Sequence, residues 1–307
     1  MQNIDRKVKY ALLSVVSNSM LILFKIIAGI LSGSVSIISE AIHSGMDLAA
    51  SIITFFSVRQ SSKPADKEHP FGHGKIENIS GLAEGLLIFV AAAVIIKEAV
   101  EKIVDPGEIE QAPIAIAVMV ISAVINLSVS RTLMRVSKEE ESMALEADAL
   151  HLKTDVLTSL GVGVGILLIL LTDFVILDSL VAIMVAVLII KEAYHLCKKA
   201  FDFLLDSKLS DVEEAEIERI INQFSDQFRD YHKLKTRKSG NCKHIDFHIT
   251  LDSEITVKEA HDLVGSLKKA MSDQIKNTRV IIHIDPFEKD ERVEIIDIID
   301  EKHDEIE

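Results

Sequence analysis

The sequence has only two cysteines among its 307 residues, Cys197 and Cys242, and neither lies in a metal-binding or redox motif. We therefore expect no framework of disulfide bonds, as is usual for a protein that faces the cytosol. Basic residues are outnumbered as well, because 47 acidic residues against 33 lysines and arginines give a formal net charge of -14. An acidic chain without a basic stripe is not expected to bind nucleic acid.

The sequence also lacks the arrangements that mark an enzyme or a secreted precursor. It contains no nucleophile-and-base constellation and no phosphate-binding loop, so we do not expect an enzyme. The first apolar segment follows the polar start MQNIDRKVKY and has no small-residue cleavage site. We expect that segment to be an uncleaved membrane span rather than a signal peptide.

Apolar residues are what the sequence has in excess. They make up 49% of the chain, and the mean hydropathy of +0.29 is too high for an ordinary soluble protein of this length. A helix needs about 20 residues to cross the hydrocarbon core of a bilayer. Segments of approximately this length or longer predict six transmembrane helices, at residues 8–31, 35–58, 79–104, 113–135, 144–171 and 177–196.

Positive charges between these segments predict their orientation. Lysine and arginine cluster before the first segment and in the second and fourth connections, whereas the alternate connections carry essentially Lys102 alone. Because basic loops stay in the cytoplasm, we expect both termini to be cytoplasmic in a multi-pass protein of the cell (inner) membrane. The first half of the fifth segment is also compatible with a soluble helix, but the run GVGVGILLILL that follows it favours a span.

The pattern changes at about residue 206, where polar residues become frequent. DVEEAEIERIINQF predicts an amphipathic helix capped by Ser210, and TVKEAHDLVGSLKKAM predicts another with a capping box of Thr256 and Glu259. Alternation in YHKLKTRKSG, KHIDFHITLD and RVIIHIDP predicts three strands, the last stopped by Pro286. The order αββαβ predicts a small ferredoxin-like α/β domain. We therefore expect a transmembrane domain at 1–205, a cytoplasmic domain at 206–288 and an acidic C-terminal tail at 289–307.

Two of the apolar segments carry ionisable residues in the same pattern. SEAIHSGMD and EADALHLKTD share the template acid, Ala, aliphatic residue, His, three residues, Asp. A charge at mid-bilayer costs roughly 2.5–3.5 kcal/mol on insertion scales, so two acids on each of two spans indicate a function. The spacing places each trio on one helical face, Glu40, His43 and Asp47 in the second segment and Asp148, His151 and Asp155 in the fifth.

The two His–Asp pairs are spaced so that both members can bind one ion. His43 with Asp47, and His151 with Asp155, would together supply four ligands, the number that tetrahedral zinc takes. The second and fifth spans run in opposite directions, and at about 1.5 Å per residue all four side chains fall near the middle of the membrane. The alternative is a set of hydrogen bonds between helices that binds no metal.

Other residues within the apolar segments carry less specific signals. Glu40 and Asp148 lie one turn from the histidines, in opposite directions along the membrane normal, where they line entry and exit paths or face a wet vestibule. Glu84 is a further intramembrane charge that could face a cavity. Gly81 and Gly85 allow close helix approach, either in a dimer or within the helical bundle.

The connection between the second and third segments holds another group of metal-ligand residues. DKEHPFGHGK places Asp66, His69 and His73 in the spacing D-x2-H-x3-H, which suits a three-ligand site with an open position. Gly72 and Gly74 allow the backbone to fold back there. A solvated polar turn is the alternative.

Histidine and aspartate also collect on one face of the predicted sheet. Apolar residues alternate with them, so one face packs on the helices and the other presents His248, His283 and Asp285. His232 of the first strand and His261 of the second helix add to this cluster of metal-ligand types. Surface histidines without a metal are the alternative.

Taken together, these features resemble the cation diffusion facilitator family. The two HxxxD pairs, the six spans, the loop DKEHPFGHGKIE and the cytoplasmic α/β domain carry the resemblance, which covers about residues 5–288. It implies a homodimer that exports a divalent metal ion from the cytoplasm in exchange for protons, by alternating access. The histidine at position 43 resembles members described as zinc-selective. The transport site implied by the family comprises His43, Asp47, His151 and Asp155.

The resemblance also assigns roles to the other two clusters. It implies a peripheral zinc site at Asp66, His69 and His73 in the loop. It implies that the cytoplasmic domain is a metal-binding dimerisation domain, with a binuclear site where metal links two subunits. The ligands of that site would be His232, His248, His261, His283 and Asp285.

The chemistry of the proposed ligands agrees with zinc. Imidazole suits zinc, cobalt, nickel and copper better than magnesium, calcium or manganese, and it binds metal only when neutral, with an ordinary pKa near 6.5. Protons and metal therefore compete for the same nitrogens, which is a physical basis for antiport. We predict a Zn2+ exporter whose partners are a second copy of the chain, divalent metal ions, protons and the lipid bilayer. The alternatives are an exporter of Cd2+, Co2+, Ni2+ or Fe2+, and a membrane metal sensor that does not transport.

Overall fold

The structure is a computed structural model, and it describes residues 2–32, 35–104, 113–172, 174 and 176–287. The chain divides into two compact units, the first consisting mainly of residues 1–207 and the second beginning at residue 208. The acidic tail predicted at 289–307 lies outside the described residues.

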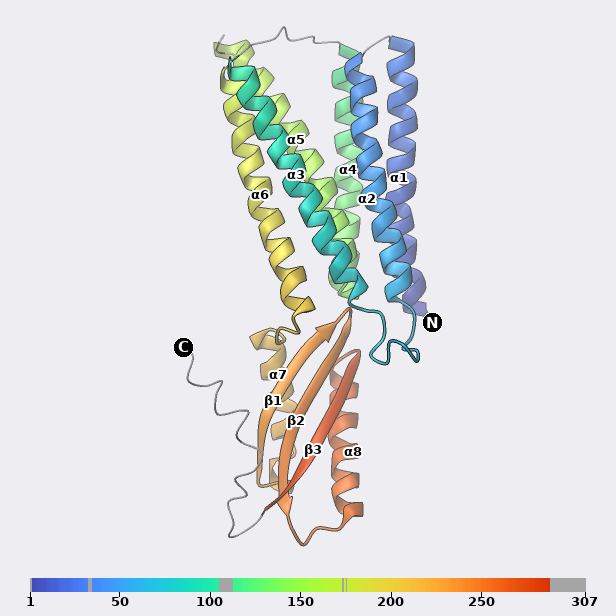
Figure 1. Ribbon diagram of the computed structural model, residues 1–307, viewed down its shortest axis with the longest axis vertical. Helices are drawn as coiled ribbons and strands as arrows, with labels where there is room; N and C mark the ends of the chain where they lie inside the picture. Colours follow the sequence, from blue (N-terminus) through green and yellow to red (C-terminus); the bar gives the residue numbers. More distant parts are fainter. Residues whose placement is uncertain (1, 33–34, 105–112, 173, 175, 288–307) are drawn as a thin grey trace. The chain divides into compact units, whose positions relative to one another are not determined.

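The first unit is built of long helices (Figure 1). Each of these helices contains one of the apolar segments predicted from the sequence. Arg6–Leu31, Ile76–Val104 and Ala117–Glu140 are long and apolar enough to cross a membrane, judged by length and composition over the described residues. The described helices of this unit are α1 Gln2–Ser32, α2 Val35–Ser61, α3 Ile76–Val104, α4 Pro113–Glu140, α5 Met143–Thr172 and α6 Ile176–Leu204.

The ionisable and apolar halves of α5 form one continuous helix of 30 residues. The structure therefore shows no break where a separate soluble helix would end. Ser130 of α4 donates a hydrogen bond to the backbone carbonyl of Ala149 at 2.6 Å, which fastens α4 to the polar half of α5. This half also carries buried alanines and leucines, so it packs as part of the bundle.

Glycines let the helices approach closely. α1 packs mainly on α2, α3 on α6, and α4 on α5. A methyl group in place of the Gly81 hydrogen would lie 2.8 Å from Cγ of Met143, which begins α5. The same change at Gly85 would bring a methyl group against the sulfur of Cys197 on α6. Contact within the bundle is therefore the role that the structure shows for this glycine pair.

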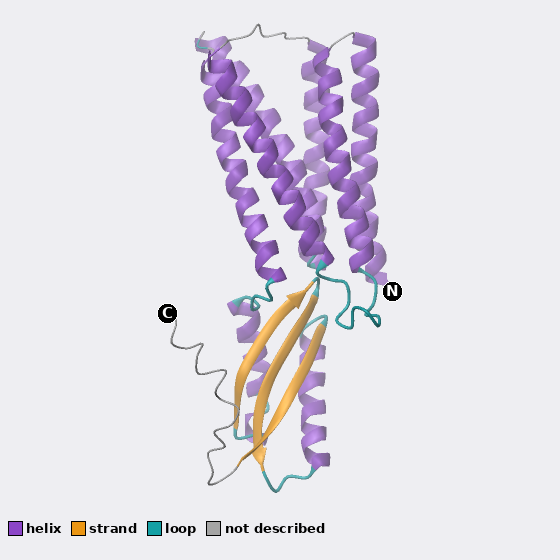
Figure 2. Ribbon diagram, viewed as in Figure 1, coloured by secondary structure: helices purple, strands orange, loops and turns teal. Residues whose placement is uncertain are grey.

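In the second unit, two helices cover one face of a three-stranded sheet (Figures 1 and 2). The strand order is β1-β2-β3, and β2 and β3 are parallel, with His248 opposite His283. The predicted order αββαβ is confirmed, with a short 3-10 turn at Ser225–Gln227 added. The elements are α7 Asp211–Asn222, β1 Asp230–Ser239, β2 Cys242–Asp252, α8 Val257–Gln274 and β3 Thr278–Phe287.

Alternation along β2 separates the core of this unit from its polar face. Phe247 and Ile249 are buried against α7 and α8 together with Leu267, so His248 between them belongs to the opposite face. The helices begin at capping boxes, Ser210 with Glu213 and Thr256 with Glu259, and the second of these is the one predicted.

The third strand ends one residue later than predicted. β3 continues through Pro286 to Phe287, so the expectation that Pro286 stops the strand is wrong by one residue. In the described sheet β3 pairs with β2 alone, so it is an edge strand. An edge strand tolerates proline, because the backbone N–H groups on its outer side make no hydrogen bonds to another strand.

Candidate metal sites

Three residues of the predicted transport site meet between α2 and α5. Asp47 from α2 and His151 and Asp155 from α5 each offer a ligand atom, and these atoms lie within 4.8 Å of one another. His151 Nε2 and Asp47 Oδ1 are 3.2 Å apart and share a hydrogen bond. Asp47 and His151 are buried, at 5% and 9% exposure, whereas Asp155 is half-buried.

Neighbouring polar groups hold the backbone of this site. The hydroxyl of Ser51 donates a hydrogen bond to the carbonyl oxygen of Asp47 at 2.8 Å, one turn back along α2. The amide of Asn18 on α1 donates to Ser51 at 2.5 Å, so α1 supports the same turn. On α5, the hydroxyl of Ser159 donates to the carbonyl of Asp155 at 2.8 Å. The carboxylates of Asp47 and Asp155 therefore come from helical turns that their neighbours brace.

The side chains of His43 and Glu40 lie outside the described residues, although α2 includes both positions. The helix places His43 one turn before Asp47 on the same face. The fourth ligand of the transport site therefore stays a prediction, as does the path residue Glu40.

Asp148 and Glu84 are buried more completely than a wet vestibule would allow. Both are 0% exposed, and Thr54 of α2 donates a hydrogen bond to one oxygen of Glu84. Sequence reasoning noted the charge of Glu84 but assigned it no contact, and it missed Ser51, Asn18 and Thr54. The available signal was the recurrence of serine, threonine and asparagine in otherwise apolar helices, since such residues hydrogen-bond across helices in membranes.

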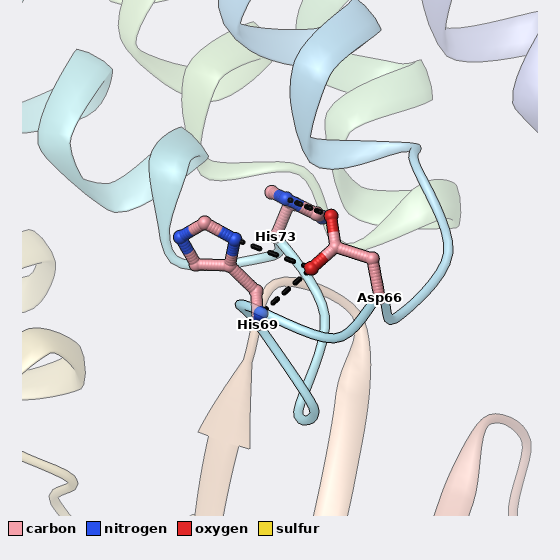
Figure 3. A group of neighbouring side chains, drawn as sticks. All are labelled: Asp66, His69 and His73. Carbon is pink, nitrogen blue, oxygen red and sulfur yellow. Dashed lines mark hydrogen bonds and ion pairs between the residues drawn. The ribbon is translucent and has the colours of Figure 1, made fainter.

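The loop residues Asp66, His69 and His73 also come together, as Figure 3 shows. Asp66 Oδ1 accepts the backbone N–H of His69 at 2.7 Å and that of Glu68 at 3.0 Å. Its carboxylate lies 3.4 Å from His69 Nδ1 through one oxygen and 3.4 Å from His73 Nε2 through the other. The N–H groups of His69 and Glu68, with the two imidazoles, hold the pKa of Asp66 below its ordinary value. The carboxylate is thus kept in the ionised form that binds metal.

A third group lies on the polar face of the sheet. His232, His248 and Asp285, one from each strand, offer ligand atoms within 4.8 Å of one another. His248 Nδ1 is 2.9 Å and His232 Nε2 is 3.2 Å from Asp285 Oδ2, and His283 Nε2 is 3.1 Å from Oδ1. Burial raises the pKa of Asp285, but the hydrogen bond from His248 and the other imidazoles outweigh burial and hold it below its ordinary value.

His261 is not part of this group within one chain. It is exposed on α8, which packs on the other face of the sheet through Leu263 and Leu267. Because the family resemblance puts the site at an interface between subunits, the role of His261 stays a prediction.

Comparison with known proteins identifies the family. Residues 11–205 match the family model described as the cation efflux transmembrane domain, and residues 209–287 match the cation efflux protein, cytoplasmic domain. An uncharacterised transporter of Synechocystis is 36% identical over 279 residues, 91% of this chain and 90% of the relative. The chain therefore belongs to the cation efflux family, the cation diffusion facilitators.

Two further relatives match over most of their length, and one solved structure resembles part of the chain. The cation-efflux pump FieF of Shewanella oneidensis is 30% identical over 90% of this chain and 92% of its own length. The manganese efflux system protein MneP of Bacillus subtilis is 29% identical over 93% and 97%. A structure titled "Mode of Action of a Putative Zinc Transporter CzrB (Zn form)" is 26% identical, with a TM-score of 0.27 over 28% of this chain and 99% of that one.

The family and the metal-ligand clusters together define the class of this protein. It is a membrane protein of divalent metal cation efflux. It has a helical transmembrane domain and a C-terminal cytoplasmic domain with a small α/β sheet. The model that matches this cytoplasmic domain is named for dimer formation.

Proposed function

We propose that this protein exports Zn2+ from the cytoplasm in exchange for protons, by alternating access of one intramembrane site to the two sides of the membrane. The observation that supports this most directly is the meeting of Asp47 from α2 with His151 and Asp155 from α5, within 4.8 Å. His43, one turn before Asp47, would add the fourth ligand that tetrahedral zinc takes. The function consists of transport alone, with no catalytic step.

The hydrogen bond between His151 and Asp47 supports the coupling to protons. A carboxylate oxygen only accepts, so a proton must lie between Nε2 of His151 and Oδ1 of Asp47, on one atom or the other. Both atoms must be free of that proton before they bind a metal ion. An entering ion therefore displaces a proton, and a returning proton releases the ion.

The wider architecture that we propose follows the family. Six spans at 1–205 would form the transport domain in the cell (inner) membrane, with both termini in the cytoplasm. Residues 206–288 would form a ferredoxin-like dimerisation domain, followed by the acidic tail. The parallel pairing of β2 with β3 supports that fold, because a ferredoxin-like sheet that lacks its first strand brings two parallel strands together.

The loop and cytoplasmic clusters would bind Zn2+ in structural or regulatory roles. The low pKa values of Asp66 and Asp285 support metal binding, since an ionised carboxylate is the form that coordinates metal. The cytoplasmic ligands His232, His248, His283 and Asp285, with His261, would link the two subunits of the homodimer through the metal.

Zinc flux into proteoliposomes with an imposed pH gradient tests the transport proposal. Wild type should take up zinc only with the gradient, and Asp155→Ala should abolish that uptake. Glu98→Ala is the matched control, because it removes an exposed carboxylate of α3 and should leave flux unchanged. Equal flux in wild type and Asp155→Ala would contradict the transport site. No flux in wild type, with zinc still bound, would favour a membrane sensor.

Export of another divalent metal is the second candidate. The name of the Bacillus subtilis relative, a manganese efflux protein, supports this candidate. Imidazole discriminates against metals that prefer oxygen ligands, so His43 should set the preference. His43→Asp should change the ratio of Zn2+ to Cd2+ or Mn2+ flux in the same vesicles. An unchanged ratio would show that His43 does not determine selectivity.

A further inference from the structure

Two carboxylates beside the transport site are buried without ordinary compensation. Glu84 on α3 and Asp148 on α5 are both 0% exposed. Thr54 donates to one oxygen of Glu84, but its Oε2 and both oxygens of Asp148 accept no hydrogen bond of ordinary geometry within the described residues. Ser14 of α1 lies beside Asp148, and Ser80 of α3 lies beside Glu84, so each carboxylate has a hydroxyl group within reach. An ionised carboxylate in such a position is costly unless a cation accompanies it or a proton neutralises it.

Both carboxylates lie at the same level of the bundle. Gly81 of α3 lies against Met143, the first residue of α5. Glu84 follows Gly81 by three residues on the same face of α3, and Asp148 follows Met143 by five. Glu84 is close enough to Asp148 to experience its charge. The two helices therefore bring a pair of acids together about one turn from His151.

The described residues around Glu84 and Asp148 do not supply enough positive charge to neutralise both carboxylates. His151, when it is protonated, acts on both carboxylates. His151 already shares its Nε2 with Asp47 at 3.2 Å. A divalent ion held by Asp47 and Asp155 would offset those two carboxylates, and Glu84 and Asp148 in their ionised forms would then carry two uncompensated negative charges. One more divalent cation would neutralise that remainder.

The chemistry of the pair points to oxygen coordination. Glu84 and Asp148 offer carboxylate oxygens, and Thr54 and Ser14 add hydroxyl oxygens. Small divalent cations such as Mg2+ and Mn2+ are commonly held by one or two carboxylates with water completing the shell. This donor set differs from the transport cluster, which contains imidazole.

We propose that Glu84 and Asp148 form a second intramembrane cation site, about one helical turn from the transport cluster toward the end where α3 and α5 begin. In the proposed orientation that end is cytoplasmic, so an incoming ion would occupy this site first. Two divalent ions a helical turn apart repel each other, and arrival of the second would drive the first onward, as in multi-ion pores. The inference builds on the proposed transport function and adds a loading site to it.

Binding of Mn2+ to the full-length protein tests this site directly. The background variant carries Asp66→Ala, Asp285→Ala and Asp155→Ala, which remove one ligand from each of the other three clusters. Electron paramagnetic resonance of Mn2+ should then count one bound ion per chain. Adding Glu84→Gln should weaken that binding at least tenfold.

Controls separate this site from general damage and from the transport proposal. Glu101→Gln, an exposed glutamate on the same helix, should leave the count at one. Thr54→Val removes one hydroxyl oxygen and keeps the carboxylates, so it should weaken binding by several-fold, and it tests the site even if Glu84→Gln fails to fold. No bound Mn2+ in the background, or binding that ignores Glu84→Gln, would overturn the proposal. Because the count is independent of zinc flux, the transport function can fail or hold separately.

Protons are the competing occupant of the pair, and the same titration distinguishes them. The released protons are measured with a pH indicator while Mn2+ is added. Proton release together with one bound ion, both lost in Glu84→Gln, supports the cation site. A Glu84-dependent proton that titrates while no Mn2+ is held would show that the pair carries protons, and it would overturn the metal site.

Discussion

A buried ion pair between α1 and α3 allows the packing of the helical unit to be tested quantitatively. Lys7 Nζ lies 3.1 Å from Glu77 Oε1, and their side chains are 8% and 1% exposed. Ser61, the last residue of α2, donates to the same oxygen at 2.7 Å, and Ser142, just before α5, donates to the other oxygen. One carboxylate thus joins four parts of the bundle.

Removing Glu77 should lower the free energy of unfolding strongly, because it leaves the buried charge of Lys7 unpaired. Glu77→Ala leaves the ammonium of Lys7 without its acceptor, and breaking a buried pair in this way costs about 3–5 kcal/mol. The double variant Lys7→Met with Glu77→Leu removes both charges and fills the space. It should recover most of that loss, because an apolar pair of similar volume is often no less stable.

The assay is equilibrium unfolding of the purified protein in mixed micelles. The matched control is the exposed pair on α3, Lys97 and Glu101, which lie 3.6 Å apart with side chains 74% and 64% exposed. Glu101→Ala should lower the free energy of unfolding by at most about 1 kcal/mol. The reasoning is refuted if Glu77→Ala costs no more than Glu101→Ala, or if the double variant is as unstable as Glu77→Ala.

Three further predictions concern the α/β unit. Phe247→Ala should lower the free energy of unfolding by about 3–5 kcal/mol in a denaturant titration, because it empties a fully buried ring position. A loss smaller than that caused by an alanine substitution at an exposed strand position would contradict the assigned core. Thr256→Ala should cost about 1 kcal/mol by removing the cap of α8, and Thr256→Ser should restore it. Since the pKa of Asp285 is lower in the folded protein, the stability it contributes is present above its ordinary value near 3.9 and is lost as pH falls through the lower folded value. Asp285→Asn should therefore flatten the acid limb of a stability-against-pH curve, and an unchanged limb would show that the histidines do not stabilise this carboxylate.

The sequence predicted best what depends on neighbours along one element. The spacing of His151 and Asp155 is local, so the helical period alone places them on one face. The alternation around His248 separates the polar from the packed face of the sheet for the same reason. The capping box at Thr256 is readable because all its atoms lie within one turn.

Contacts between distant elements could not be read in this way. Lys7 and Glu77 are 70 residues apart, and no period in the sequence says which face of α1 meets α3. The position of Asp148 against Glu84 depends on how α3 packs on α5 through Gly81, and this is a property of the assembled bundle. Pro286 misled because a proline breaks central strands but not an edge strand such as β3.

Because its ligands come from both α2 and α5, the geometry of the transport cluster depends on how these two helices are placed along each other. His151 and Asp155 are carried on the same helix, so their spacing is fixed, and the variable that remains is the position of Asp47 relative to them. Sliding α2 along α5 by a single residue would move Asp47 by about 1.5 Å, whereas metal–ligand bonds tolerate only about 0.2 Å. Occupancy by an ion and sliding of the two helices thus exclude each other, so a cargo ion selects one helix register while it is bound.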